Sequence, residues 1–284
     1  MEHRIEPLIA ERAPWLYSNH LSTDLARRIL HRVLGYQKTI TLADSFAKKN
    51  SAQIMQDLGK RLAQHVQVQG LGNLPAHGPA LIVANHPTGI ADGIILYHLI
   101  ARQRPDVYFL ANQDILRVLP QMQNMIAPVE WRHDKRSHSK TRATMAFIRK
   151  STDQGRMGVI FPSGRLAQRR GLRLYERPWM ASAAMLARKF DLPVVPVNIQ
   201  ARNSALFYLL DKLHPTLRDI TLFHETLNKD RQPFRVTIGE PISASALPRG
   251  SEEGIALLRK ATLSLAGDDA PTVNLVKSAR SWVR

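Results

Sequence analysis

Hydrophobic and polar positions form two kinds of pattern that alternate along most of this chain. Short apolar or alternating runs, which predict β-strands, lie at residues 80–84, 107–110, 157–161, 194–199 and 235–238. Between them, apolar residues recur at helical spacing over residues 92–102, 142–151 and 179–189. Strands that alternate with helices of this length are typical of a parallel sheet covered by helices. The expected fold class is therefore α/β, with a mixed, mostly parallel sheet wrapped by helices.

The two ends of the chain are expected to be helical, unlike the middle, where strands and helices alternate. We expect residues 1–65 to form an N-terminal helical segment, residues 66–245 to form the α/β core, and residues 246–284 to form a C-terminal helical tail. The helix of that tail is expected at residues 252–265, because the Gly and Pro residues that follow it break the pattern.

One helix expected in the N-terminal segment, near residues 22–34, is basic and amphipathic. Its apolar stripe contains Leu25, Ile29, Leu30, Val33 and Leu34, and the residues off the stripe include Arg27, Arg28, His31 and Arg32. Such a helix can lie in the headgroup boundary of an anionic membrane, or it can pack on its own domain with a solvated basic face, and the pattern leaves both open. No apolar stretch approaches the roughly 18 residues needed to span a bilayer. A protein of this kind that meets a membrane is expected to lie on it peripherally.

Composition narrows the class of protein. With 284 residues and 44% hydrophobic content, the chain can bury one sizeable core. Its formal net charge of +17 favours a polyanionic partner, namely nucleic acid, an anionic membrane surface or an acidic carrier protein. Residues 132–173 carry much of this charge, because they hold twelve Lys or Arg residues and only two acidic ones, Asp134 and Asp153.

The absence of cysteine excludes several chemistries. With no Cys in the sequence, disulfides, thiolate metal sites and a cysteine acyl-enzyme are ruled out. His133 and His138 are five residues apart with cationic residues between them, which disfavours a divalent metal ion. We therefore expect no metal and no resident cofactor.

The most informative segment joins the apolar run at residues 80–84 to the helical pattern near Asp92. Open α/β sheets place their sites at the carboxyl ends of strands, where His86 lies. Asp92, six residues later, can accept the imidazole N–H of His86 and leave the other ring nitrogen free as a base. The same two residues can equally be a loop histidine and a helix-capping carboxylate, so this spacing alone does not decide.

The residues around this pair carry a family resemblance. The segment Asn85-His86-Pro87-Thr88-Gly89-Ile90-Ala91-Asp92 resembles the first signature of the glycerolipid and lysophospholipid acyltransferase family, which includes 1-acyl-glycerol-3-phosphate acyltransferases. The five residues between His86 and Asp92, where the common form has four, match the hemolysin-like bacterial branch. A second block, Phe161-Pro162-Ser163-Gly164-Arg165, is similar to the Phe-Pro-Glu-Gly-Thr-Arg block, with Ser163 in place of Glu. Further similar blocks at residues 192–197, 202–207 and 239–242 extend the resemblance over residues 66–245.

The resemblance implies a function and a site. An acyl group would pass from acyl-CoA or acyl-carrier protein to the hydroxyl of a lysophospholipid, such as 1-acyl-glycerol-3-phosphate or a lyso-ornithine lipid, in membrane lipid biosynthesis at the cytoplasmic face of the membrane. His86 would be the base and Asp92 its orienting group, and backbone donors near Gly89 or Gly164 would meet the oxyanion. The substrate-binding residues would be Asn85, Gly89, Phe161, Pro162, Ser163, Gly164, Arg165 and, in an arginine-bearing loop, Arg132 or Arg136.

Three other functional classes agree less well with the sequence. A basic nucleic-acid-binding protein fits the net charge, but no recognised DNA- or RNA-binding signature is present, so no specific nucleic acid is expected. A serine hydrolase is disfavoured, because Phe161 stands where the nucleophile elbow of Ser163 requires Gly. Ser163 is the only feature that suggests a protein with this fold but without catalysis. The intact His86 and Asp92 argue against that class.

Overall fold

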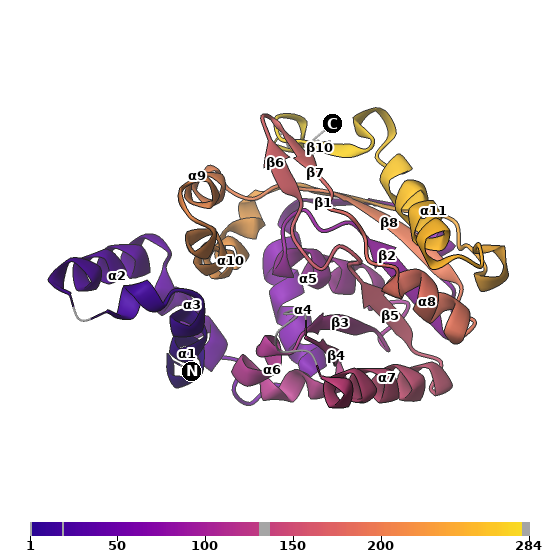
Figure 1. Ribbon diagram of the computed structural model, residues 1–284, viewed down its shortest axis with the longest axis horizontal. Coiled ribbons are helices and arrows are strands. Elements are labelled where there is room, and N and C mark those ends of the chain that lie inside the picture. Colours follow the sequence, from indigo (N-terminus) through magenta and orange to yellow (C-terminus); the bar gives the residue numbers. More distant parts are fainter. Residues whose placement is uncertain (1, 19, 131–136, 280–284) are drawn as a thin grey trace.

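The structure is a computed structural model and describes residues 2–18, 20–130 and 137–279 (Figure 1). Its centre is a seven-stranded sheet in the order β1-β9-β8-β2-β5-β3-β4. The bounds are β1 Val66–Gln69, β2 Ala80–Ala84, β3 Tyr108–Asn112, β4 Ile126–Val129, β5 Met157–Ile160, β8 Val194–Gln200 and β9 Phe234–Ile238. All neighbouring strands pair in parallel except β8 and β9, which are antiparallel. The predicted α/β fold with a mixed, mostly parallel sheet is confirmed.

The middle strand β2 explains why these runs become buried strands. Its five residues are all buried, and both neighbours, β5 and β8, pair with it in parallel. Because side chains alternate across a strand, Ile82 faces one hydrophobic cluster while Leu81 and Val83 face another. A strand covered on both faces needs a continuous apolar run, which the sequence supplies at this position.

Helices cover the two faces of the sheet. The cluster that contains Ile82 includes side chains of α4 (Ser51–Leu62) and α5 (Ile90–Ile100), which pack against each other. The cluster that contains Leu81 includes side chains of α7 (His138–Asp153), α8 (Ser182–Lys189) and α11 (Ser251–Ser264). In Figure 1, α8 and α11 lie side by side along one side of the sheet. The helix α4, which the sequence places in the N-terminal segment, is thus part of the core packing.

The helices before α4 form a separate cluster at the end of the molecule away from the sheet (Figure 1). They are α1 (Glu2–Arg12), α2 (Leu21–Val33) and α3 (Tyr36–Asp44), and they pack with side chains from α6 (Asp114–Val118), α9 (Ala205–Leu213) and α10 (Pro215–Asn228). The expected apolar stripe of α2 is divided in space. Leu34, which caps the helix, is buried and Leu30 is packed against the cluster, whereas Leu25, Ile29 and Val33 are 60%, 53% and 49% exposed.

A second, three-stranded antiparallel sheet lies beside the main one. It contains β6 (Gln168–Arg170), β7 (Arg173–Tyr175) and β10 (Thr272–Asn274) in the order β10-β7-β6. The tail predicted as helical at residues 246–284 therefore contains the predicted helix, α11, and also a strand. The three residues of β10 are too few to show a periodic pattern, and their pairing with β7 is what makes them a strand.

Candidate active site

The site begins where β2 ends. Asn85, which is buried, donates from its amide nitrogen to the carbonyl oxygen of Ile199 at 2.9 Å and accepts from the Ile199 amide at 2.7 Å. These two hydrogen bonds tie the loop after β2 to the neighbouring strand β8. Asn85 therefore fixes the point at which the chain turns, and the next residue, His86, lies at the carboxyl end of the sheet.

His86 and Asp92 lie together in the structure. Nδ1 of His86 is 2.9 Å from Oδ2 of Asp92, with the imidazole 19% exposed and the carboxylate fully buried. The two groups are close but not aligned as a linear hydrogen bond. Catalytic hydrogen bonds are often poorly aligned without substrate and tighten in the complex. The arrangement leaves Nε2 of His86 on the opposite side of the ring, away from the carboxylate.

The Asp92 carboxylate is held by its own loop. Oδ2 accepts from the backbone amides of Thr88 and Gly89, at 2.9 and 3.0 Å, and Oδ1 accepts from the Thr88 hydroxyl. Asp92 lies in the first turn of α5, so its bond to the Gly89 amide also caps the helix. Gly89 has a φ of 98° and a ψ of −133°, a conformation that side-chain-bearing residues rarely adopt. The glycine thus lets the chain fold back far enough for Asp92 to meet His86.

The second predicted block, residues 161–165, packs against the loop that carries His86. The ring of Phe161 stacks on the imidazole of His86, with centroids 4.2 Å apart and planes at 25°. The turn that follows is closed by a hydrogen bond from the Gly164 amide to the Phe161 carbonyl oxygen at 2.9 Å. Pro162 and Ser163 are buried, and Arg165 is exposed beside them. The two blocks that the sequence singled out, far apart in the chain, are therefore brought together at one site.

The oxyanion donors expected near Gly89 or Gly164 stay a prediction, although the amides of the two glycines themselves already have acceptors. The Gly89 amide already donates to Asp92, and the Gly164 amide already donates to Phe161. In this conformation neither amide is available to a tetrahedral oxyanion. The physical reason is that both glycines close tight turns, and each turn uses the amide of its glycine.

Sequence reasoning missed a buried acid at the site. Glu176 follows β7, and its carboxyl accepts from the backbone amide of His86 at 3.2 Å and from the indole N–H of Trp179 at 3.0 Å. Burial raises the pKa of this carboxyl, against the lowering effect of hydrogen bonds from Trp179, His86 and Ser163. Ser163 stands where the similar family block has Glu, and the carboxyl of Glu176 lies close to this turn and to the backbone of His86. No motif signals it, because its position depends on the β6–β7 hairpin.

Two expectations lie partly outside the described structure. Arg132 and Arg136, expected in an arginine-bearing loop, lie outside the described residues. Within residues 2–18, 20–130 and 137–279 no group of three or more His, Cys, Asp or Glu side chains is arranged to hold a metal ion. The expectation of a site without metal or cofactor stays a prediction.

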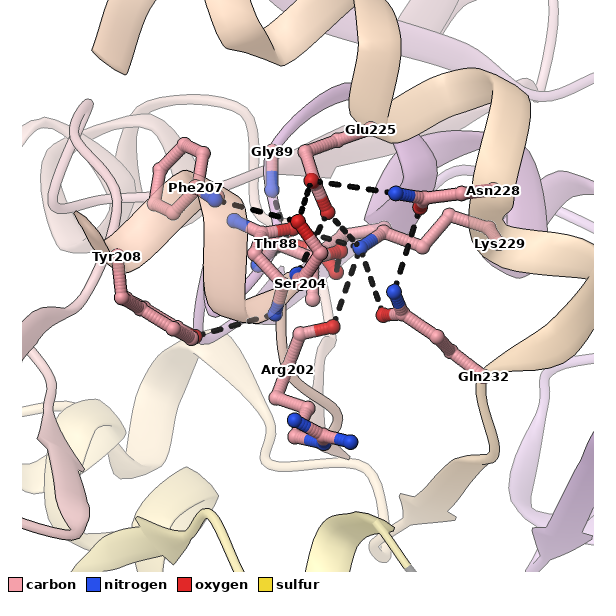
Figure 2. Close-up of polar contacts among 12 residues, drawn as sticks. Thr88, Gly89, Arg202, Ser204, Phe207, Tyr208, Glu225, Asn228, Lys229 and Gln232 are labelled. Atoms are coloured by element: carbon pink, nitrogen blue, oxygen red, sulfur yellow. Dashed lines mark hydrogen bonds and ion pairs between the residues drawn. The ribbon is translucent and has the colours of Figure 1, made fainter. Parts of the chain in front are cut away.

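A second buried network lies behind the Asp92 loop (Figure 2). Nζ of Lys229 is fully buried and donates to the Glu225 carboxylate at 2.8 Å, to the Asn203 side chain at 2.7 Å and to the Arg202 carbonyl oxygen at 3.1 Å. The Ser204 hydroxyl and amide donate to the same Glu225 carboxylate. Burial lowers the pKa of Lys229, whereas the negative charges of Glu225 and Asp92 oppose that effect. Asp92 is thus within electrostatic reach of a buried cation.

Comparison with known proteins agrees with the fold described above. A crystal structure of the 1-acyl-sn-glycerophosphate acyltransferase PlsC from Thermotoga maritima matches with a TM-score of 0.51 at 14% identity, covering 87% of this chain and 98% of that one. This likeness shows a shared fold. The family model described as Acyltransferase matches residues 65–200, which is the part of the chain that carries both predicted blocks.

Two curated proteins, both named lyso-glycine lipid O-acyltransferase, are similar in sequence. The protein from Phocaeicola vulgatus is 27% identical over 184 residues, which cover 62% of this chain and 64% of that protein. The protein from Bacteroides thetaiotaomicron is 28% identical over 184 residues, which cover 62% and 65%. The match thus spans just under two thirds of either relative. Together with the family model, these findings confirm the resemblance to the acyltransferase family over residues 65–200.

Proposed function

We propose that this protein is an O-acyltransferase that moves a fatty acyl group from a thioester donor to the hydroxyl of a lyso-lipid. The observation that carries the proposal is the 2.9 Å contact between His86 and Asp92 at the carboxyl end of the central strand. A buried carboxylate on one ring nitrogen leaves the other nitrogen as a general base, and the imidazole is partly exposed to substrate.

The reaction that fits this geometry is a direct transfer. Nε2 of His86 takes the proton of the acceptor hydroxyl while the oxygen attacks the thioester carbonyl carbon. The tetrahedral intermediate collapses, the carbon–sulfur bond breaks, and the leaving thiolate receives the proton from the imidazolium. Asp92 holds the ring orientation and stabilises the imidazolium through its negative charge. No acyl-enzyme is needed, which accords with a chain that lacks cysteine.

We infer that the acceptor is a lyso-lipid whose headgroup carries a carboxylate or a phosphate. The relatives' names point to lyso-glycine lipids, and the sequence resemblance points to 1-acyl-glycerol-3-phosphate and lyso-ornithine lipid as the other candidates. Arg165, exposed at the turn beside His86, offers a guanidinium that pairs with carboxylate or phosphate. The donor is acyl-CoA or acyl-carrier protein, and the net charge of +17 suits either of these anionic donors.

We propose further that the protein binds an anionic membrane surface through α2, at the cytoplasmic face. Leu25, Ile29 and Val33 form an exposed row along this helix, and Arg28 and Arg32 are exposed beside them. Apolar side chains of this kind enter the headgroup boundary while flanking cations meet anionic lipid. Among the described residues, no helix is long and apolar enough to cross a membrane.

The test is an acyl-transfer assay with purified protein. Labelled acyl-CoA or acyl-carrier protein is offered with lyso-glycine lipid, lyso-ornithine lipid and 1-acyl-glycerol-3-phosphate, and the O-acylated product is followed. His86→Ala is expected to lower kcat/KM by about 10²- to 10⁴-fold, as loss of a general base does. Asp92→Asn is expected to lower it as well.

Matched substitutions at exposed positions serve as controls. His65→Ala and Asp153→Asn change the same residue types outside the site, so they are expected to leave the rate unchanged. Full activity of His86→Ala would refute the proposed role of the pair. Absence of product with every donor and acceptor, together with tight binding to nucleic acid that weakens with salt, would favour the basic binding protein instead.

A further inference from the structure

The β6–β7 hairpin stands directly on the loop that carries His86. The amide of Ala167, the residue before β6, donates to the carbonyl oxygen of His86 at 2.9 Å. The carboxyl of Glu176, the residue after β7, accepts from the amide of His86 at 3.2 Å. Each strand has three residues, which span about 10 Å, and in Figure 1 the hairpin reaches the upper margin of the molecule. The turn of the hairpin is therefore close to the catalytic base but outside the site.

The face of the hairpin that points away from α9 is exposed and cationic. Leu174 of β7 is buried and packs with aromatic side chains of α9. Because side chains alternate along a strand, Arg173 and Tyr175 point to the opposite face, and both are exposed. Arg170 of β6 is paired with Arg173 in the strand register, so it shares that face. Residues 165–175 hold four arginines and no acidic residue, so no negative charge of the hairpin offsets this face.

Arg170 and Arg173 are a cross-strand pair of like charge. Like charges directly opposite each other destabilise a pair of strands. The guanidinium of Arg170 lies over the ring of Tyr175, 5.4 Å from its centroid, and Arg173 donates to the hydroxyl of Thr272 at 3.0 Å. Within the part of the chain that the structure describes, neither arginine forms an ion pair with an acidic side chain. The hairpin thus holds two uncompensated charges in fixed places, although their repulsion opposes its folding.

An apolar side chain completes this surface. Leu172, in the turn of the hairpin, is 62% exposed. Val276 is also exposed, and it lies nearby because the amide of Leu275 donates to the carbonyl oxygen of Leu172 at 3.0 Å. Small molecules bind in concave sites, whereas a protein interface combines apolar side chains with a polar rim. An exposed leucine beside two unpaired arginines on a hairpin turn therefore fits the surface of an acidic protein.

We propose that the hairpin surface, which consists of Arg170, Leu172, Arg173 and Tyr175, docks an acidic acyl-carrier protein that supplies the acyl thioester to His86. The inference rests on the proposed function, and it selects the carrier protein from the two donors named there. Acidic side chains of the carrier pair with the two guanidinium groups, whose planar shape matches carboxylates. A carrier protein holds its acyl group on a flexible arm, so docking is needed beside the catalytic base and not over it.

The hairpin surface is separate from the proposed membrane contact. In Figure 1, α2 lies at the far left, whereas the hairpin lies at the upper margin. The helix α9 packs against both regions, because its Leu210 belongs to the N-terminal cluster and its Tyr208 packs in the cluster that contains Leu174. A lipid acceptor and a water-borne donor can therefore be bound through different surfaces of the protein.

The first test compares palmitoyl-CoA with a palmitoylated bacterial acyl-carrier protein as donor. Arg170→Glu creates a cross-strand pair of opposite charge, so it should keep or raise the temperature of thermal unfolding. Its kcat/KM with the carrier protein is expected to fall about 10- to 100-fold, because electrostatic steering is lost, while kcat/KM with palmitoyl-CoA stays at the wild-type value. Arg170→Lys keeps the charge and should retain most of the rate with the carrier protein.

The matched control for Arg170→Glu is Arg149→Glu. Arg149 is exposed on α7, which lies at the lower margin of Figure 1, and the substitution changes the net charge by the same amount. It should leave kcat/KM unchanged with both donors. This control separates the place of the charge from the total charge of the protein.

A second measurement does not depend on acyl transfer. Surface plasmon resonance with immobilised acyl-carrier protein should show binding of the wild type that weakens as salt is added, and much weaker binding of Arg170→Glu. Leu172→Ser should weaken this binding by about tenfold, because the carrier covers the leucine. If the carrier protein binds the wild type and not Arg170→Glu while no lyso-lipid is acylated, the proposed function fails and the docking surface stands.

Several results would overturn the inference. One is a wild-type protein that does not bind the carrier protein, and another is Arg170→Glu binding it as tightly as the wild type. An equal fall of kcat/KM with both donors would show that the hairpin meets a group that CoA also carries. A loss of vesicle binding in Arg170→Glu would make the hairpin a membrane contact instead.

Discussion

The Nζ of Lys229 lies 2.8 Å from Oε2 of Glu225, and neither side chain is more than 2% exposed. A buried ion pair is weak evidence for stability, since desolvation offsets the attraction, but removal of one partner leaves an uncompensated buried charge. Lys229→Met or Glu225→Gln alone should therefore lower the free energy of unfolding by about 3–5 kcal/mol. The double substitution should lower the free energy of unfolding by less than the sum of the two single effects. Urea or guanidinium unfolding of the four proteins measures this.

An exposed ion pair provides the control for that series. Lys49 and Asp57 lie 2.6 Å apart with side chains 38% and 41% exposed. Exposed ion pairs contribute about 0–1 kcal/mol to stability, so Lys49→Met should change the free energy of unfolding little. If Lys49→Met and Lys229→Met lowered the free energy of unfolding equally, the role assigned to burial of the pair would be wrong.

The pH dependence of stability gives a second expectation for the same pair. Burial raises the pKa of Glu225, but attraction to Lys229 and hydrogen bonds from Lys229 and Ser204 outweigh it, so the pKa lies below its ordinary value. A carboxyl whose folded pKa is depressed stabilises the fold above its unfolded pKa of about 4.3, and this stabilisation is lost as the pH falls through the lower folded value. Glu225→Gln should therefore show a shallower loss of unfolding free energy in acid than the wild type. An identical acid dependence would refute this assignment.

Asn85 provides another prediction, because it joins the catalytic loop to β8. Asn85→Ala removes two hydrogen bonds and leaves the amide and carbonyl of Ile199 without their partner, which should cost about 1–3 kcal/mol for each unsatisfied group. Hydrogen exchange at the Ile199 amide should accelerate, and kcat should fall. Asn73→Ala is the control, since Asn73 bonds the end of β9 through a single donor. Exchange at Ile199 that is as slow as in the wild type would show that Asn85 does not hold this junction.

The part of this molecule that the sequence could predict is the part with strong periodicity or a contiguous motif. The strand at residues 80–84 is found with the predicted bounds, since a fully buried strand must be apolar throughout. The meeting of His86 and Asp92 could be expected because a short loop joins His86 to the first turn of α5, where Asp92 lies. Their meeting with Phe161 required the additional inference that parallel strands end at the same edge of the sheet.

The remaining features depend on contacts between distant segments. Glu176 reaches the site only because a short hairpin folds over it, and three-residue strands give no periodic signal. The pair Glu225 and Lys229 has the spacing of an ordinary surface pair on a helix, and burial of both charges follows from tertiary packing alone. The stripe of α2 was predicted as one surface, whereas packing of Leu34 against the N-terminal cluster divides it in two.

The exposed half of that stripe leads to a prediction about membranes. A triple substitution of Leu25, Ile29 and Val33 by Ser should weaken binding to vesicles that contain anionic phospholipid, because these side chains are expected to enter the headgroup boundary. Co-sedimentation with vesicles of phosphatidylglycerol and phosphatidylethanolamine measures it. Leu172→Ser, at a residue 62% exposed on the β6–β7 hairpin, is the control. Equal binding of the triple variant and the wild type would exclude α2 as the contact.

Gly89 supports the last prediction, because its backbone conformation is what brings Asp92 to His86. At a φ of 98°, a Cβ would be strained, and it would lie 3.2 and 3.3 Å from methyl groups of Leu166 and Leu222. Gly89→Ala should therefore cost about 1–3 kcal/mol of stability. The Gly89 amide donates to Asp92, so any shift of this turn also moves the carboxylate, and kcat should fall by about 10- to 100-fold.

The matched control for Gly89→Ala is Gly72→Ala, since a Cβ on Gly72 would meet no atom within 4 Å. Thermal unfolding and the acyl-transfer rate of the two variants, measured side by side, separate a general effect of added methyl groups from the specific geometry of the catalytic loop. If Gly89→Ala kept both the stability and the rate of the wild type, the loop would tolerate a conventional backbone at this position. The approach of Asp92 to His86 would then be independent of a glycine at position 89, since the two bonds from Thr88 to the carboxylate do not require one.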